Sequence, residues 1–201
     1  MGAETGQIRA FVAAPLDSEW LARIRRVQDA LQRQTQTEGV RWSRPEQLHL
    51  TLKFFGNIPT HDLDALELAL DRSAQGIASI LLRVGRLGCF PSRQRPSVIW
   101  LGLAGELEEL RRLQSNIERE CERFGSHSET HGFHPHLTIG RVKAAGAQGR
   151  RIGEAVEAGQ AENLGPWRVD EITLVQSLLG PQGSAYTPLA RFKLHSPGVP
   201  R

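Results

Sequence analysis

The chain has 201 residues, a formal net charge of +3, 39% hydrophobic and 23% charged residues, which suits one medium-sized domain or two small lobes that share an interface. No run approaches the roughly 18 apolar residues of a membrane helix, and residues 1–6 lead directly into a strand without a signal-peptide core. We therefore expect a cytosolic protein with no membrane segment. The mild positive charge favours anionic partners but lacks the dense basic clusters of a dedicated nucleic-acid binder.

The first half of the chain predicts alternating strands and helices, from the spacing of its apolar residues and from its turn signals. The expected elements are a strand over 8–14, a helix over 19–34, a strand over 47–55, a helix ending near 74 and a strand over 77–87. In the third element, strict alternation places Leu48, Leu50, Leu52 and Phe54 on one face and His49, Thr51, Lys53 and Phe55 on the other.

The second half repeats this order after a loop expected over 88–97. Its elements are a strand over 98–103, a helix over 105–124, a strand over 134–142, a short helix over 151–158 and strands over 167–179 and 186–195. An internal repeat of roughly 8–88 and 98–179 predicts one bilobal domain over 1–201, with the closing strand, 184–195, packing back on the lobes. The predicted class is α+β, with two pseudo-symmetric αβ lobes, mainly antiparallel sheets flanking a central cleft and helices outside.

One tetrapeptide occurs in both halves, as His49-Leu50-Thr51-Leu52 and as His136-Leu137-Thr138-Ile139, 87 residues later. In a strand, residues i and i+2 share a face, so each histidine lies beside its threonine while the leucine between them points into the core. The duplication therefore predicts two imidazoles and two hydroxyls that face one cleft.

This set of groups suits acid–base chemistry at a phosphate. Near neutral pH one imidazole can accept a proton while the other donates one. A threonine hydroxyl can donate a hydrogen bond to an anionic oxygen without adding charge. The four side chains thus fit an in-line displacement at phosphorus that requires no metal.

The twin motifs resemble those of the two-histidine (2H) phosphoesterase superfamily, and in particular the RNA 2′,3′-cyclic phosphodiesterases of the LigT/ThpR type, formerly called 2′-5′ RNA ligases. The resemblance extends from about Ile8 to Leu194. It rests on the segments IRAFVAAPL, QLHLTLKFFG, SVIWLGL, HPHLTIGRV and YTPLARFKL. One such motif would mean little, whereas two at this spacing with these flanks are highly specific.

The resemblance implies hydrolysis of a 2′,3′-cyclic phosphate, at an RNA end or in a small cyclic nucleotide, to a 2′-phosphomonoester, without metal or cofactor. It assigns His49 as the proton donor to the 3′ oxygen and His136 as the proton acceptor that activates water. Thr51 and Thr138 would bind the phosphate, and the family's substrate-binding arginine matches Arg141. We expect a monomer with no obligate protein partner.

The position of Arg141 conflicts with strict alternation, which places it on the face opposite His136. Gly140 permits a bulge or a twist that would bring the arginine round to the cleft. On the first motif strand, Lys53 is expected either to contact phosphate or to be solvated. Phe55 is expected to pack in the core rather than to stack on a base.

Three other functions stay open on the residues alone. A binding module could keep the cleft without turnover. Joining a 2′,3′-cyclic end to a 5′-hydroxyl through a 2′-5′ bond would use the same residues in reverse. The cluster of His131, His134 and His136 could hold a metal, although no carboxylate or cysteine stands at ligand spacing on that strand.

Overall fold

The computed structural model describes residues 6–35, 39–125, 132–159, 164–180 and 183–194. Within these ranges no helix has the length and apolar character needed to cross a membrane. The helices are α1 (Ser18–Thr35), α2 (Leu63–Ala74), α3 (Leu107–Glu120) and α4 (Gly146–Ala158). The strands are β1 (Gln7–Pro15), β2 (Val40–Trp42), β3 (His49–Pro59), β4 (Ile80–Ser92), β5 (Arg95–Gly105), β6 (His136–Val142), β7 (Pro166–Val169), β8 (Glu171–Gly180) and β9 (Gly183–Lys193).

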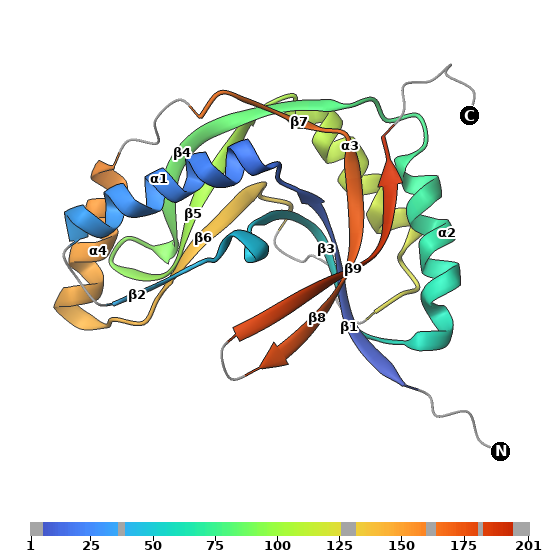
Figure 1. Ribbon diagram of the computed structural model, residues 1–201, viewed down its shortest axis with the longest axis horizontal. Coiled ribbons are helices and arrows are strands. Elements are labelled where there is room, and N and C mark those ends of the chain that lie inside the picture. The colour runs from blue at the N-terminus through green and yellow to red at the C-terminus, as the bar shows by residue number, and fades with distance from the viewer. Residues whose placement is uncertain (1–5, 36–38, 126–131, 160–163, 181–182, 195–201) are drawn as a thin grey trace.

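The strands form one nine-stranded sheet in the order β7-β4-β5-β6-β3-β1-β8-β9, with β2 paired to β6. The pairings are antiparallel, as predicted. The two motif strands, β3 and β6, meet at a single pair, Leu50 with Leu137, and this short contact joins the two sides of the sheet. The predicted pair of sheets is therefore one curled sheet (Figure 1).

The two sides of the sheet draw on both halves of the chain. Strand β4 leaves the first half to pair with β5, and β8 leaves the second half to pair with β1. The helices cross over in the same way, because α1 packs with α4 and α2 packs with α3. Figure 1 shows the first helix pair on the left and the second on the right. The extent of the sequence repeat stays a prediction.

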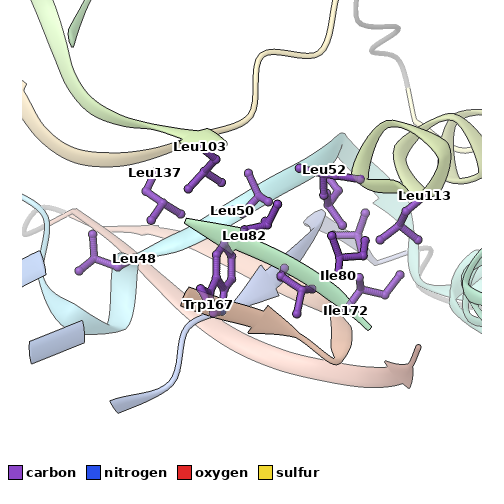
Figure 2. Packing of buried hydrophobic residues seen from close by; sticks show 14 of the residues in the cluster. Leu48, Leu50, Leu52, Ile80, Leu82, Leu103, Leu113, Leu137, Trp167 and Ile172 are labelled. Carbon is purple, nitrogen blue, oxygen red and sulfur yellow. The ribbon is translucent and has the colours of Figure 1, made fainter. Parts of the chain in front are cut away.

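The core lies between the sheet and these helices. Figure 2 shows leucines of β3, β4, β5 and β6 packed with Trp167 and Ile172. Leu50 and Leu137 are at most 1% exposed, so the apolar residue between histidine and threonine points into the core in both motifs, as predicted. Burial of one such side chain stabilises the fold by about 1.5–3 kcal/mol, which anchors the backbone that carries the neighbouring polar residues.

Residues 88–97 were predicted to be a loop, but they form the end of a hairpin between β4 and β5. The prediction rested on Pro91 and Pro96, which cannot donate to a ladder of hydrogen bonds. The two prolines lie opposite each other beside a register shift, so neither interrupts a regular stretch of the ladder. The hairpin extends to Ser92 and Arg95, and it brings further aromatic side chains towards the second motif.

Candidate active site

The two motif strands bring the predicted site residues to one pocket of about 190 Å³. His49 and Thr51 enter from β3, and His136 and Thr138 enter from β6; all four are half-buried. The pocket is lined by Arg41, Trp42, Ser43, Gln47, His49, Thr51, Phe54, His136, Thr138, Arg141, Gly183, Ser184 and Tyr186. Among the residues that the structure describes, no carboxylate lines it, so its field favours an anionic ligand.

Strict alternation fails in β3 after Thr51. Two register shifts against β1 each leave one residue of β3 without a partner. Leu52 is the first, because Ala13 pairs with Thr51 and Val12 with Lys53. Phe55 is the second, because Phe11 pairs with Phe54 and Ala10 with Gly56. Each bulge reverses the faces of the residues that follow it. The predicted positions of Lys53 and Phe54 were therefore wrong, whereas Phe55 is in the core, as predicted.

Lys53 lies behind the pocket and not in it. Its side chain is 4% exposed and forms an ion pair with Glu118 of α3, which also accepts a hydrogen bond from Gln114 Nε2 at 3.0 Å. Both expectations for Lys53, a phosphate contact and a solvated side chain, are therefore wrong. Phe54, which the alternation had placed with the core leucines, is 45% exposed and lines the pocket.

A third bulge brings Arg141 into the pocket. Gly140 of β6 pairs with Ile99, and Thr138 pairs with Trp100, so Ile139 is the extra residue. The shift places Arg141 on the face of His136. Gly140 contributes space, because a Cβ there would lie 3.1 Å from Trp42 Cε3. A second arginine, Arg41 of β2, pairs directly with Arg141 across the strands and lines the same pocket.

The His136 ring is held by the backbone. Its Nδ1 lies 2.7 Å from the carbonyl oxygen of His134, which fixes Nδ1 as the donor and leaves Nε2 with a free lone pair in the neutral ring. The ring forms a T-shaped pair with Phe90, with centroids 5.2 Å apart. This tautomer can accept a proton at Nε2.

The His49 ring is in a more apolar setting. It stacks on Phe11 with centroids 4.8 Å apart and meets Tyr186 edge-on at 5.3 Å. Burial lowers its pKa from 6.5 to about 4, although a hydrogen bond to the Gln47 backbone opposes the shift. In the free protein at neutral pH, His49 is therefore neutral, and once protonated it is a strong proton donor.

Comparison with known proteins gives the family. A family model described as the 2′-5′ RNA ligase superfamily matches residues 15–181. The chain belongs to this superfamily. It is 33% identical over 189 residues to a protein of Methanothermobacter thermautotrophicus named RNA 2′,3′-cyclic phosphodiesterase, which covers 94% of this chain and all of that protein. A protein of Archaeoglobus fulgidus with the same name is 29% identical and covers 92% of this chain and all of its own.

Solved structures of the superfamily share the fold. The structure of E. coli LigT complexed with 3′-AMP superimposes with a TM-score of 0.76 at 27% identity, covering 94% of this chain and 99% of that chain. The structure of LigT complexed with phosphate gives a TM-score of 0.69 at the same identity, covering 94% and 98% of the two chains. The predicted family and the predicted fold class are thus confirmed.

The described residues give no support to the alternative that the cluster of His131, His134 and His136 holds a metal. Among them, no three His, Cys, Asp or Glu side chains gather as a metal site requires. His131 lies outside the described residues, and the carbonyl of His134 serves as the acceptor for His136. The chelator experiment given below tests the metal alternative directly.

The low pKa of His49 predicts a pH dependence of stability. Between pH 6.5 and pH 4 the unfolded chain binds a proton at His49 that the folded chain does not, so stability falls as the pH falls through this window. By pH 4.5 the loss amounts to about 2 to 3 kcal/mol. Urea unfolding at pH 7 and pH 4.5 should show a smaller pH effect for His49→Gln than for the wild type. Equal pH effects in the two proteins would refute the assignment of this pH dependence to His49.

Sequence analysis missed a buried amide that supports the second motif. Gln28 of α1 is 2% exposed, and its Nε2 donates to the carbonyl oxygens of Ser43 and Ile139, each at 2.8 Å. Ser43 adds a hydrogen bond from its Oγ to the carbonyl of Thr138 at 2.9 Å. These bonds hold the bulge between Thr138 and Arg141. The signal was a polar residue next to Val27 on the apolar face of a helix.

Gln28→Leu should therefore impair both stability and turnover. We expect the free energy of unfolding to fall by about 1–3 kcal/mol, because buried carbonyl groups lose a donor. We expect kcat on a cyclic nucleotide to fall by about tenfold, because the threonine and the arginine shift from their positions. The matched control is Gln34→Leu, on an exposed position of the same helix, which should change neither. Wild-type kcat in Gln28→Leu would show that the bulge needs no support from α1.

Proposed function

We propose that this protein hydrolyses the 2′,3′-cyclic phosphate at RNA ends, or in small cyclic nucleotides, to a 2′-phosphomonoester. The observation that carries the proposal is the pair of half-buried histidines that reach one pocket from neighbouring strands, each with a threonine beside it. Its superfamily and the names of its relatives from Methanothermobacter and Archaeoglobus support the same activity.

The reaction is an in-line displacement at phosphorus. Nε2 of His136 takes a proton from a water molecule, whose oxygen attacks the phosphorus while the bond to O3′ breaks. His49 donates a proton to the departing O3′. The hydroxyls of Thr51 and Thr138 donate hydrogen bonds to the non-bridging oxygens, and the Arg141 guanidinium stabilises their charge. Each proton and each bond is accounted for without a metal.

The substrate itself supplies the condition for proton donation. In the free protein the pKa of His49 is about 4, so the ring is neutral at pH 7. A phosphodiester anion in the pocket favours the imidazolium and raises this pKa. Substrate binding is therefore coupled to proton uptake. His49 becomes an imidazolium only when there is a leaving oxygen to protonate.

The test uses a short RNA that ends in a 2′,3′-cyclic phosphate, incubated with the wild-type protein in EDTA. Loss of the cyclic end supports the proposal, and a requirement for added metal would replace it with a metallohydrolase. Tight binding without turnover would instead establish a binding module.

The cytosolic location and the monomeric state belong to the same proposal. Gel filtration with light scattering tests the second of these, and a mass of twice 22.3 kDa would overturn it.

A further inference from the structure

We propose that Arg41 binds the phosphate at the 5′ position of the nucleotide that carries the cyclic phosphate, so that the site prefers RNA ends to cyclic nucleosides. This inference rests on the proposed function. The two kinds of substrate differ at this position, because an RNA end carries a phosphodiester there and a 2′,3′-cyclic nucleoside phosphate carries a hydroxyl. Arg41 thereby selects the RNA end.

Two arginines reach the active-site pocket from neighbouring strands. Arg41 of β2 pairs directly with Arg141 of β6, and both line the pocket. Side chains of a directly opposed pair lie close together, and like charges in such a pair repel each other. The described residues that line the pocket include no carboxylate, so the pocket suits a ligand with two anionic groups. The family resemblance assigns Arg141 to the phosphate that reacts, which leaves Arg41 for a second anion.

The Arg41 guanidinium lies against the start of β9. A Cβ at Gly183 would collide with Nη2 of Arg41 and would lie 3.0 Å from its Cζ, so the guanidinium covers this glycine. The neighbouring residue of β9 is tied to the first motif, because Gln47 Nε2 donates a hydrogen bond to the carbonyl oxygen of Ser184 at 3.0 Å. Arg41 therefore reaches from the β6 side of the pocket to the side built by β9 and the first motif.

This side of the pocket is also the aromatic side, and it holds His49. The Phe11 ring of β1 contacts the rings of His49, Phe54 and Tyr186, with centroids 4.8, 5.6 and 5.0 Å away. Tyr186 also meets the His49 ring edge-on at 5.3 Å, and it belongs to β9, the strand at whose start the Arg41 guanidinium lies. One cation and one aromatic surface thus lie together beside His49.

The mechanism places the terminal nucleoside on the same side. His49 protonates O3′, and O3′ belongs to the ribose of the nucleotide that carries the cyclic phosphate, so this ribose lies beside His49. The ribose carries its base at C1′ and the further phosphate at C5′. Phe54 and Tyr186 offer the base a surface on which to stack. Arg41 offers the 5′ phosphate a guanidinium, whose planar set of donors matches phosphate oxygens.

The preference is measured with two substrates that differ only at the 5′ position, 2′,3′-cyclic AMP and its 5′-phosphorylated form. For the wild-type protein we expect kcat/KM to be about tenfold higher on the 5′-phosphorylated substrate, because it adds one charge-assisted hydrogen-bonded contact. For Arg41→Ala the ratio of the two values should fall to about one. A dinucleotide that ends in a 2′,3′-cyclic phosphate, and so carries a 5′ phosphodiester as RNA does, should follow the 5′-phosphorylated substrate in both proteins.

The ratio separates substrate selection from a structural role. If Arg41 only held the start of β9 in place, Arg41→Ala would lower kcat/KM on both substrates by the same factor and the ratio would stay near ten, which would overturn the assignment. Arg141→Ala should behave in this way, because Arg141 contacts the phosphate that reacts. Arg41→Lys should restore part of the preference, since lysine keeps the charge but not the planar fork.

Arg44 provides the matched control. It lies three residues from Arg41, is exposed and is not among the residues that line the pocket. Its backbone N–H donates to Oε1 of Gln47 at 3.2 Å, and an alanine keeps this bond. Arg44→Ala removes the same charge from the same segment and should keep the tenfold preference. An equal loss of preference in Arg44→Ala would show that net charge selects the substrate, and the assignment to Arg41 would be wrong.

The two proposals fail in different ways. If the wild-type protein hydrolyses 2′,3′-cyclic AMP without preferring the 5′-phosphorylated form, Arg41 does not bind the 5′ phosphate and the proposed function stands. The same conclusion follows if Arg141→Ala loses the preference while Arg41→Ala keeps it. If neither substrate reacts, both proposals fail.

Discussion

Replacement of His136 by alanine should reduce kcat on 2′,3′-cyclic AMP by about 10²–10⁴-fold, which is the usual contribution of a general base. The structure gives the reason, because His136 lines the pocket and the contact of its Nδ1 with the His134 carbonyl leaves Nε2 as the proton acceptor. The same loss is expected for His49→Ala. Steady-state rates by chromatography of the products measure both.

The fold should survive these replacements. Both rings are half-buried at the edge of the pocket, so their removal leaves the core leucines of the motifs in place. Circular dichroism and thermal unfolding check this. His61→Ala provides a matched control, since His61 is exposed and is not among the residues that line the pocket. If both active-site variants keep near-normal rates, the two-histidine mechanism is wrong.

Replacement of Glu118 by alanine should lower the free energy of unfolding by about 3 kcal/mol, because it leaves the Lys53 ammonium buried without its partner. Glu118 itself is 27% exposed on its side-chain surface, so the loss lies at the lower end of the range for buried pairs. Urea unfolding at pH 7 measures it. The double variant Lys53→Met with Glu118→Leu should recover most of the stability.

The same experiment decides where Lys53 acts. Because Lys53 faces α3 and not the pocket, Lys53→Met should leave KM for cyclic AMP unchanged in protein that remains folded. An increase of KM in Lys53→Met, together with normal stability of Glu118→Ala, would return Lys53 to the cleft and would contradict the bulged register of β3.

The sequence contained most of the candidate site because its signal is local. Leu50 and Leu137 in the core follow from the alternation of a strand. The histidine and threonine beside each of them line one pocket for the same reason. The repetition of the motif indicated one shared pocket rather than two unrelated strands. Family resemblance then supplied the activity.

What the sequence could not show depends on cross-strand register. The bulges at Leu52 and Phe55 arise from pairing with β1, and alternation within one strand carries no trace of them. They decide that Lys53 is buried and that Phe54 reaches the pocket, whereas the bulge that brings Arg141 to His136 had a signal in the sequence, which is Gly140. The place of Arg41 in the pocket could not be predicted either, since it follows only from the pairing of β2 with β6.

The exchange of elements between the two sides of the molecule was also beyond the sequence. The repeat suggested that each half of the chain builds its own lobe, yet β4 and β8 each pair across the halves. Hydrophobic periodicity predicts which face of a helix is buried, but it does not predict which element packs against that face. Gln28 reaches the bulge of β6 only because α1 packs on the side of the sheet built mainly by the second half.

The central claim is that His136 activates the nucleophile and His49 protonates O3′, and the position of the phosphate in the product tests it most directly. Phosphorus NMR of the reaction with 2′,3′-cyclic AMP in EDTA should show adenosine 2′-phosphate as the sole product of the wild-type protein, formed about 10²–10⁴-fold more slowly by His136→Ala. Adenosine 3′-phosphate as the main product would mean that O2′ leaves, and the claim that His49 protonates O3′ would be contradicted.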